Sequence, residues 1–211
     1  MVSIGDPHLW ADVFPDDLVP AIIDVVLDSW KAFPAPAPDA LEVPITREFH
    51  IYLRRHKDRT KLPFSIMVEP DEIDPETGEQ LGRIDLRLHH GYLESVYFAL
   101  ECKRLNVVAD GKRSSLAGKY VEEGMVRFVT GKYAQGLDKG GMVGYVMDGK
   151  LDDAILAVKE AVEKKRELLK MGKKATLDES SLRPSVKQVK ETKHRQAKRP
   201  FLIHHIFLPV G

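Results

Sequence analysis

Residues 82–90, GRIDLRLHH, alternate apolar and polar side chains with a period of two, the pattern of a β-strand with one buried face. A second strand is predicted at 95–105, SVYFALECKRL, which is apolar almost throughout until the charged residues near its end. Gly91 supplies a turn between the two strands. We therefore expect two neighbouring strands of an antiparallel meander.

Helical and strand-like segments surround this pair. Strands are expected at 63–69, 142–148 and 201–208, helices at 45–56, 115–131 and 151–170, and loops at 70–80, 106–115 and 171–199. The order helix, strand, strand, strand, helix, strand, helix, strand predicts an α/β domain with a mixed sheet flanked by helices. In this arrangement the later strands are joined through helices.

The first forty residues are predicted to form an appendage to a domain at 41–211. Residues 16–33 have the pattern of an amphipathic helix, and PAPAPD at 34–39 is typical of a stiff, extended linker. The apolar face of the helix must be covered by the protein's own domain or by a second chain; it consists of Val19, Ile22, Ile23, Val26 and Trp30.

The charge of the chain is balanced in total but not along its length. There are 32 Lys and Arg residues and 32 Asp and Glu residues, yet residues 159–199 hold 14 of the basic and 6 of the acidic ones, a balance of +8. This segregation is compatible with a surface that binds a polyanion, although a solvated basic helix and loop would give the same pattern.

Cellular context is only weakly constrained. We find no run of 18 apolar residues and no secretory signal, and so expect neither a membrane span nor export. The single cysteine, Cys102, cannot form an internal disulfide, which fits a reducing cytoplasm.

Two acids and a lysine are expected to converge where the two strands pair. Side chains alternate across a strand, so Glu101 and Lys103 share one face and Cys102 takes the other, while Asp85 points away from Ile84. Carboxylates that meet at one point repel, and a divalent cation such as Mg²⁺ relieves this repulsion. The alternative is an amphipathic hairpin in which both acids face solvent and the lysine makes an ordinary cross-strand ion pair.

Asp85 followed by Glu101-Cys102-Lys103 resembles the PD-(D/E)XK signature of the restriction-endonuclease-like nuclease superfamily, except that Ile84 stands where the pattern has proline. The resemblance implies an αβββαβ core, extending here from about residue 45 to residue 148. It also implies hydrolysis of DNA phosphodiester bonds with Mg²⁺ or Mn²⁺. Asp85, Glu101 and the carbonyl of Cys102 would hold the metal, and Lys103 would position the attacking water.

The resemblance adds further candidates. In the family an acid from the first helix often completes the metal site, which suggests Glu48 here; the alternative is a boundary glutamate in an ion pair. Some members carry Gln-x-x-x-Tyr in the following helix, where this chain has Leu116 and Tyr120. The candidate substrate contacts are otherwise solvated bases and a core tyrosine: Lys112, Arg113, Lys119, Tyr120 and Arg127.

Two functional hypotheses follow. The first is a Mg²⁺-dependent deoxyribonuclease of restriction, repair or anti-phage defence. The second is a non-catalytic nuclease-like subunit that binds or assembles within a complex. Nucleic acid, most directly DNA, is the expected partner, together with a second copy or another protein. Because paired acids repel, we also expect removal of either acid to leave stability unchanged or raised in the absence of metal.

Overall fold

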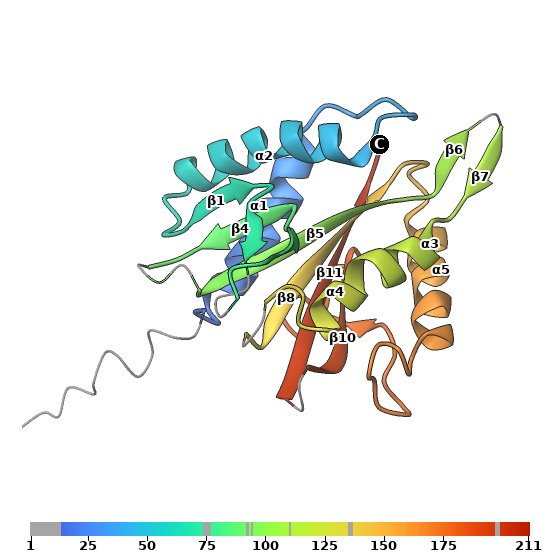
Figure 1. Ribbon diagram of the computed structural model, residues 1–211. Helices are drawn as coiled ribbons and strands as arrows, with labels where there is room; N and C mark the ends of the chain where they lie inside the picture. The colour runs from blue at the N-terminus through green and yellow to red at the C-terminus, as the bar shows by residue number, and fades with distance from the viewer. Residues whose placement is uncertain are drawn as a thin grey trace, which may run out of the picture.

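The centre of the fold is a seven-stranded mixed sheet, shown by a computed structural model that describes residues 14–73, 77–91, 93, 95–109, 111–134, 137–196 and 199–211 (Figure 1). In spatial order its strands are β1 (Ser65–Val68), β4 (Leu86–His89), β5 (Tyr97–Leu105), β8 (Lys139–Val146), β11 (Arg199–Pro209), β10 (Val189–Gln196) and β9 (Asp178–Glu179). The predicted α/β class with a mixed sheet is confirmed. Residues 1–13 of the predicted N-terminal segment, 74–76 of the predicted 70–80 loop and 197–198 of the predicted 171–199 loop lie outside the described part.

Strand direction divides the sheet into three parts. β1, β4 and β5 form the predicted antiparallel meander. β5, β8 and β11 run parallel to one another, and β10 and β9 return antiparallel. Parallel neighbours require a long crossover, and a helical segment supplies the one between β5 and β8.

Helices cover both faces of the sheet (Figure 1). On one face, α1 (Leu18–Ala32) and α2 (Glu42–Arg59) pack against the side chains of Phe98 and Leu100. The other face carries α5 (Leu151–Lys164) and a continuous helical segment of α3 (Ala117–Lys119), η2 (Tyr120–Met125) and α4 (Val126–Val129). The six residues of η2 are π-helical.

The N-terminal helix α1 belongs to the main hydrophobic core. Ile22 and Ile23 are fully buried in the same cluster as residues of β5, β8 and β11. The indole nitrogen of Trp30 donates to the carbonyl oxygen of Pro209 over 2.7 Å. The apolar face of the helix is thus covered by the protein's own domain, and within the described residues α1 is no surface appendage.

The predicted single strand at 82–90 is wrong in one respect, because it is interrupted at Ile84 and Asp85. β3 (Gln80–Arg83) pairs with β2 (Asp71–Ile73) in a separate ribbon, whereas β4 pairs within the main sheet. Ile84 and Leu86 consequently enter the cores on opposite faces of the sheet. The partner strand bends at the same place, where Glu69 has a φ of 51°.

Other corrections concern polar segments and element ends. The predicted 171–199 loop contains β9 and β10, and the predicted 106–115 loop contains the hairpin of β6 (Val107–Ala109) and β7 (Lys112–Ser114). The predicted 70–80 loop contains β2 and the first residue of β3. The helix predicted at 45–56 begins three residues earlier, at Glu42, and the one predicted at 151–170 ends at Lys164. No helix in the described ranges has the length and hydropathy that a membrane crossing requires.

Candidate active site

The candidate site is built on a free edge of β5. β4 pairs with β5 only over Tyr97–Leu100, so from Glu101 onward β5 has a strand partner on the β8 side alone. Two carboxylates take the place of the missing strand. Asp85 accepts a hydrogen bond from the backbone N–H of Cys102 at 2.6 Å, and Glu42 accepts one from that of Arg104 at 3.0 Å. Both acids therefore satisfy backbone donors that would otherwise lie unpaired at the strand edge.

Lys103 lies among oxygen atoms beside this edge. Its ammonium donates to Glu101 Oε1 at 2.7 Å, to the Cys102 carbonyl at 2.9 Å and to Glu42 Oε1 at 2.9 Å. The residue is only 8% exposed. Its side-chain stem runs past η2 at Gly124, where an added Cβ would lie 3.6 Å from Lys103 Cγ. The structure thus brings Glu101 and Lys103 together on one face, as the strand alternation predicts.

Glu101 is the most deeply buried acid of the site, with no exposed surface. Its Oε1 also accepts from Arg127 Nη1 at 2.7 Å. Its Oε2 is buried and has no hydrogen-bond partner among the described residues. A buried carboxylate oxygen without a donor is costly, and a cation or a water at that atom would satisfy it.

Burial dominates the proton affinities of the two predicted metal ligands. Burial raises the pKa of Asp85 to about 6, against the opposing charge of Lys103. Burial, with the charge of Asp85, raises the pKa of Glu101 to about 8 despite the two cations in contact with it. Burial alone would lower the pKa of Lys103, but Glu101, Glu42 and Asp85 together raise it. The lysine is therefore a firm cation, whereas the acids titrate near neutrality.

The fit of a divalent metal is partial. The open Oε2 of Glu101, the carboxylate of Asp85 and the Cys102 carbonyl are oxygen ligands of the kind Mg²⁺ prefers. Within the described residues, however, no group of three or more His, Cys, Asp or Glu side chains is arranged to hold a metal ion. A cation there would depend on backbone and water oxygens as well as the two acids.

The acid that the first helix contributes is Glu42, and the prediction of Glu48 for that place is wrong. Glu48 is exposed on α2, whereas Glu42 bridges Lys103 and the edge of β5. The error came from the helix start, since a helix expected from residue 45 excludes residue 42. Glu42 lies three residues before the buried Ile45, a spacing that places both on one face of a helix.

The predicted substrate contacts on the following helix have three different environments. Lys119 is exposed. Tyr120 is fully buried and its hydroxyl bonds His205 Nδ1 at 3.0 Å, which corrects its assignment as a surface contact and matches the core alternative. Arg127 is half-buried, and its guanidinium contacts Glu101 and the Tyr133 hydroxyl.

The two basic residues of the β6–β7 hairpin differ in availability. Lys112 is exposed on β7. Arg113 forms ion pairs with Asp148 at 2.8 Å and Asp153 at 3.0 Å. These acids compete with any phosphate for the Arg113 guanidinium. Lys112 is therefore the more accessible of the two cations.

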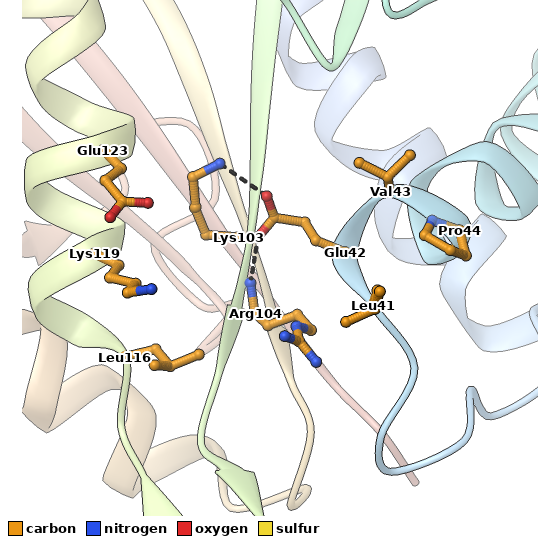
Figure 2. Close-up of a pocket in the computed structure, with 9 residues that line it drawn as sticks. All are labelled: Leu41, Glu42, Val43, Pro44, Lys103, Arg104, Leu116, Lys119 and Glu123. Carbon is orange, nitrogen blue, oxygen red and sulfur yellow. Dashed lines mark hydrogen bonds and ion pairs between the residues drawn. The ribbon is translucent and has the colours of Figure 1, made fainter.

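A pocket of about 300 Å³ opens beside Lys103, between the start of α2 and the α3–η2 segment (Figure 2). Figure 2 shows Glu42 reaching across the gap to Lys103, with Lys119 and Glu123 on the opposite wall. The lining residues are Leu41, Glu42, Val43, Pro44, Lys103, Arg104, Leu116, Lys119 and Glu123. The pocket joins the edge of β5 to solvent.

Comparison of the chain with protein families, with characterised proteins and with solved structures found no match.

Proposed function

We propose that this protein is a metal-dependent nuclease that hydrolyses phosphodiester bonds in DNA, in restriction, repair or anti-phage defence. The observation that carries the proposal is the gathering of Asp85, Glu101 and Lys103 at the free edge of β5, beside an open pocket. The order of α2, β1, β4, β5, the helical segment at 117–129 and β8 supports it, because it is the αβββαβ order that the resemblance implies.

The roles of the side chains follow from their contacts. Asp85 and Glu101, with the Cys102 carbonyl, would hold Mg²⁺ or Mn²⁺, which when bound supplies Lewis-acid stabilisation of negative charge on the phosphate. Lys103 is held as a cation between Glu101 and Glu42 and can orient a water or stabilise charge developing on the phosphate. Arg127 fixes the orientation of the Glu101 carboxylate through Oε1 and leaves Oε2 open.

A second candidate function is a non-catalytic, nuclease-like subunit. One observation favours it: each acid of the site already has a structural partner. Asp85 and Glu42 satisfy backbone N–H groups of β5, and Glu101 is paired with Lys103 and Arg127. A binding module could retain these acids for folding alone, so their presence does not by itself require catalysis.

A nuclease assay separates the two candidates. The purified chain is incubated with Mg²⁺ or Mn²⁺ and with single- and double-stranded DNA and RNA, and its melting temperature is measured with and without each metal. The nuclease proposal expects metal-dependent cleavage of DNA and a raised melting temperature. Lys103→Met should keep metal-induced stabilisation while cleavage falls about 10²- to 10⁴-fold. Absence of both cleavage and stabilisation for the wild type would favour the binding module.

A further inference from the structure

The reactive groups of the candidate site are recessed. Glu101 has no exposed surface and Lys103 is 8% exposed, so a phosphate reaches them only through the pocket beside α2. The pocket volume of about 300 Å³ is at the lower end of the range for small-molecule sites. A space of this size admits one nucleotide-sized group and is too small for a double helix.

One wall of the pocket is apolar although it faces solvent. Leu41 is 60% exposed and Val43 is 41% exposed, and Pro44 continues this wall at the start of α2. Leu116 faces them from the other side and has a φ of 52°, a left-handed conformation that is uncommon for leucine. Backbone strain of this kind is concentrated at ligand sites. An exposed apolar wall beside a charged centre suits a ligand with a flat apolar part and an anionic part.

The opposite wall supplies a cation for the anionic part. Lys119 is exposed, lines the pocket and makes no ion pair with any described residue (Figure 2). Arg104 is engaged through the carbonyl of Ala40, and Lys103 through Glu42 and Glu101. The acids of the lining are Glu42, which is bonded through both oxygens, and Glu123. Lys119 is thus positioned to contact a phosphate at the pocket mouth.

We infer that the pocket takes an unpaired nucleotide of a DNA strand, with its base against Leu41, Val43 and Leu116 and a flanking phosphate at Lys119. The inference rests on the proposed nuclease function and narrows its substrate to single-stranded DNA or strand ends. Enzymes whose reacting atoms lie in a recess act on single strands or extrude a nucleotide, and apolar side chains stack on the base. Stacking and backbone cations together are the usual means of binding single strands.

The test measures binding in EDTA, so that it does not depend on cleavage. Fluorescence anisotropy compares a labelled single-stranded oligodeoxynucleotide with the same strand annealed to its complement. The wild type should bind the single strand at least about tenfold more tightly. The double variant Leu41→Ser/Val43→Ser should lose about tenfold or more of single-strand affinity, the scale expected for lost base stacking. Ile51→Ser is the matched control, because Ile51 lies on α2 outside this pocket and is 47% exposed.

A second comparison isolates the phosphate contact. Lys119→Gln should weaken single-strand binding and reduce its salt dependence, whereas Lys159→Gln, at an exposed position of α5, should change neither. Equal affinity for single and double strands, or pocket variants that behave like their controls, would overturn the inference. Selective single-strand binding without metal-dependent cleavage would leave the pocket assignment standing and remove the nuclease proposal. Cleavage of both forms at equal rates, unaffected by the pocket variants, would do the reverse.

Discussion

The Asp85 carboxylate has two roles that substitution can separate. It accepts the Cys102 N–H at 2.6 Å, and it is a proposed metal ligand. Asparagine keeps a neutral acceptor for that N–H, whereas alanine leaves the donor without one. We therefore expect Asp85→Asn to stay within about 1 kcal/mol of the wild type in unfolding free energy and Asp85→Ala to lose about 1–3 kcal/mol. Both should lose metal-dependent cleavage.

Urea unfolding and a cleavage assay on the same preparations check this prediction. If Asp85→Asn retained wild-type cleavage, Asp85 would not be a metal ligand and its hydrogen bond would be its whole function. If the two variants were equally unstable, the N–H contact would not be what Asp85 contributes to the fold.

The contacts of Glu101 reverse the expectation that removing an acid leaves stability unchanged or raised. Glu101→Gln removes the negative charge that lies against Lys103 and Arg127. Breaking a buried ion pair leaves an uncompensated charge, so we expect a loss of about 3 kcal/mol, at the low end of the usual range because Glu42 still neutralises Lys103. Asp152→Asn, which breaks an exposed pair with Lys187, should cost less than about 1 kcal/mol.

Urea unfolding of both variants without metal measures these two losses. A Glu101→Gln protein as stable as Asp152→Asn would mean that repulsion between Glu101 and Asp85 offsets the attraction of the two cations. That result would restore the expectation drawn from the sequence.

At this scale the sequence predicted the residue types better than their surroundings. Strand alternation placed Glu101 and Lys103 on one face correctly, because a period of two requires no knowledge of tertiary contacts. Arg127 was predicted as a substrate contact, and only the packing of the helix on β5 reveals its bond to Glu101. Glu42 was missed because the start of α2 has no side-chain cap to mark it.

Among the elements, α1 makes the clearest prediction because its apolar face is fully covered. Ile22 has no exposed surface, and Ile22→Ala should destabilise the protein by about 2–5 kcal/mol through lost burial and the cavity that remains. Ile51→Ala on α2 is the control, since Ile51 is 47% exposed and its truncation should cost less than about 1 kcal/mol. Thermal or urea unfolding distinguishes the two; equal small losses would show that α1 is not anchored to the sheet in solution.

The strand most clearly missed from the sequence is β10, and its composition explains why. Its sequence VKETKHRQ has almost no apolar residues, yet most of its side chains are buried. Hydrogen bonds take the place of apolar contacts: Glu191 accepts from the Ser181 hydroxyl at 2.6 Å, and Thr192 lies between His194 and His205. Hydrophobic periodicity detects only strands that bury apolar faces, so this strand carried no signal.

For the whole molecule, the sequence predicted the layers but not the order of the strands. The antiparallel meander and the parallel β5–β8 step follow from turn and helix lengths between consecutive strands. The place of β11 between β8 and β10 depends on contacts distant in the chain. This placement also buries His204 and His205 on opposite faces of the sheet, in keeping with the expectation that adjacent strand residues point apart.

Buried histidines and buried acids give the stability of the molecule opposing dependences on pH. Burial lowers the pKa of His194 and of His204 to about 4, so the stability from keeping them neutral is present above about pH 6.5 and is lost as the pH falls toward 4. Burial raises the pKa of Asp85 to about 6 and of Glu101 to about 8. Their contribution is present at low pH and is lost as the pH rises through those values.

Substitution of His204 isolates one of these terms. His204 lies near Phe98 on β11, its Nδ1 has no hydrogen-bond partner among the described residues, and its charged neighbours are Glu191 and Lys139. Between pH 7 and 4.5, His204→Leu and His204→Gln should each lose about 2 kcal/mol less unfolding free energy than the wild type, because neither side chain takes up a proton. Urea titrations at several pH values measure the slopes, and wild-type slopes in both variants would mean that His204 is not held neutral by the fold.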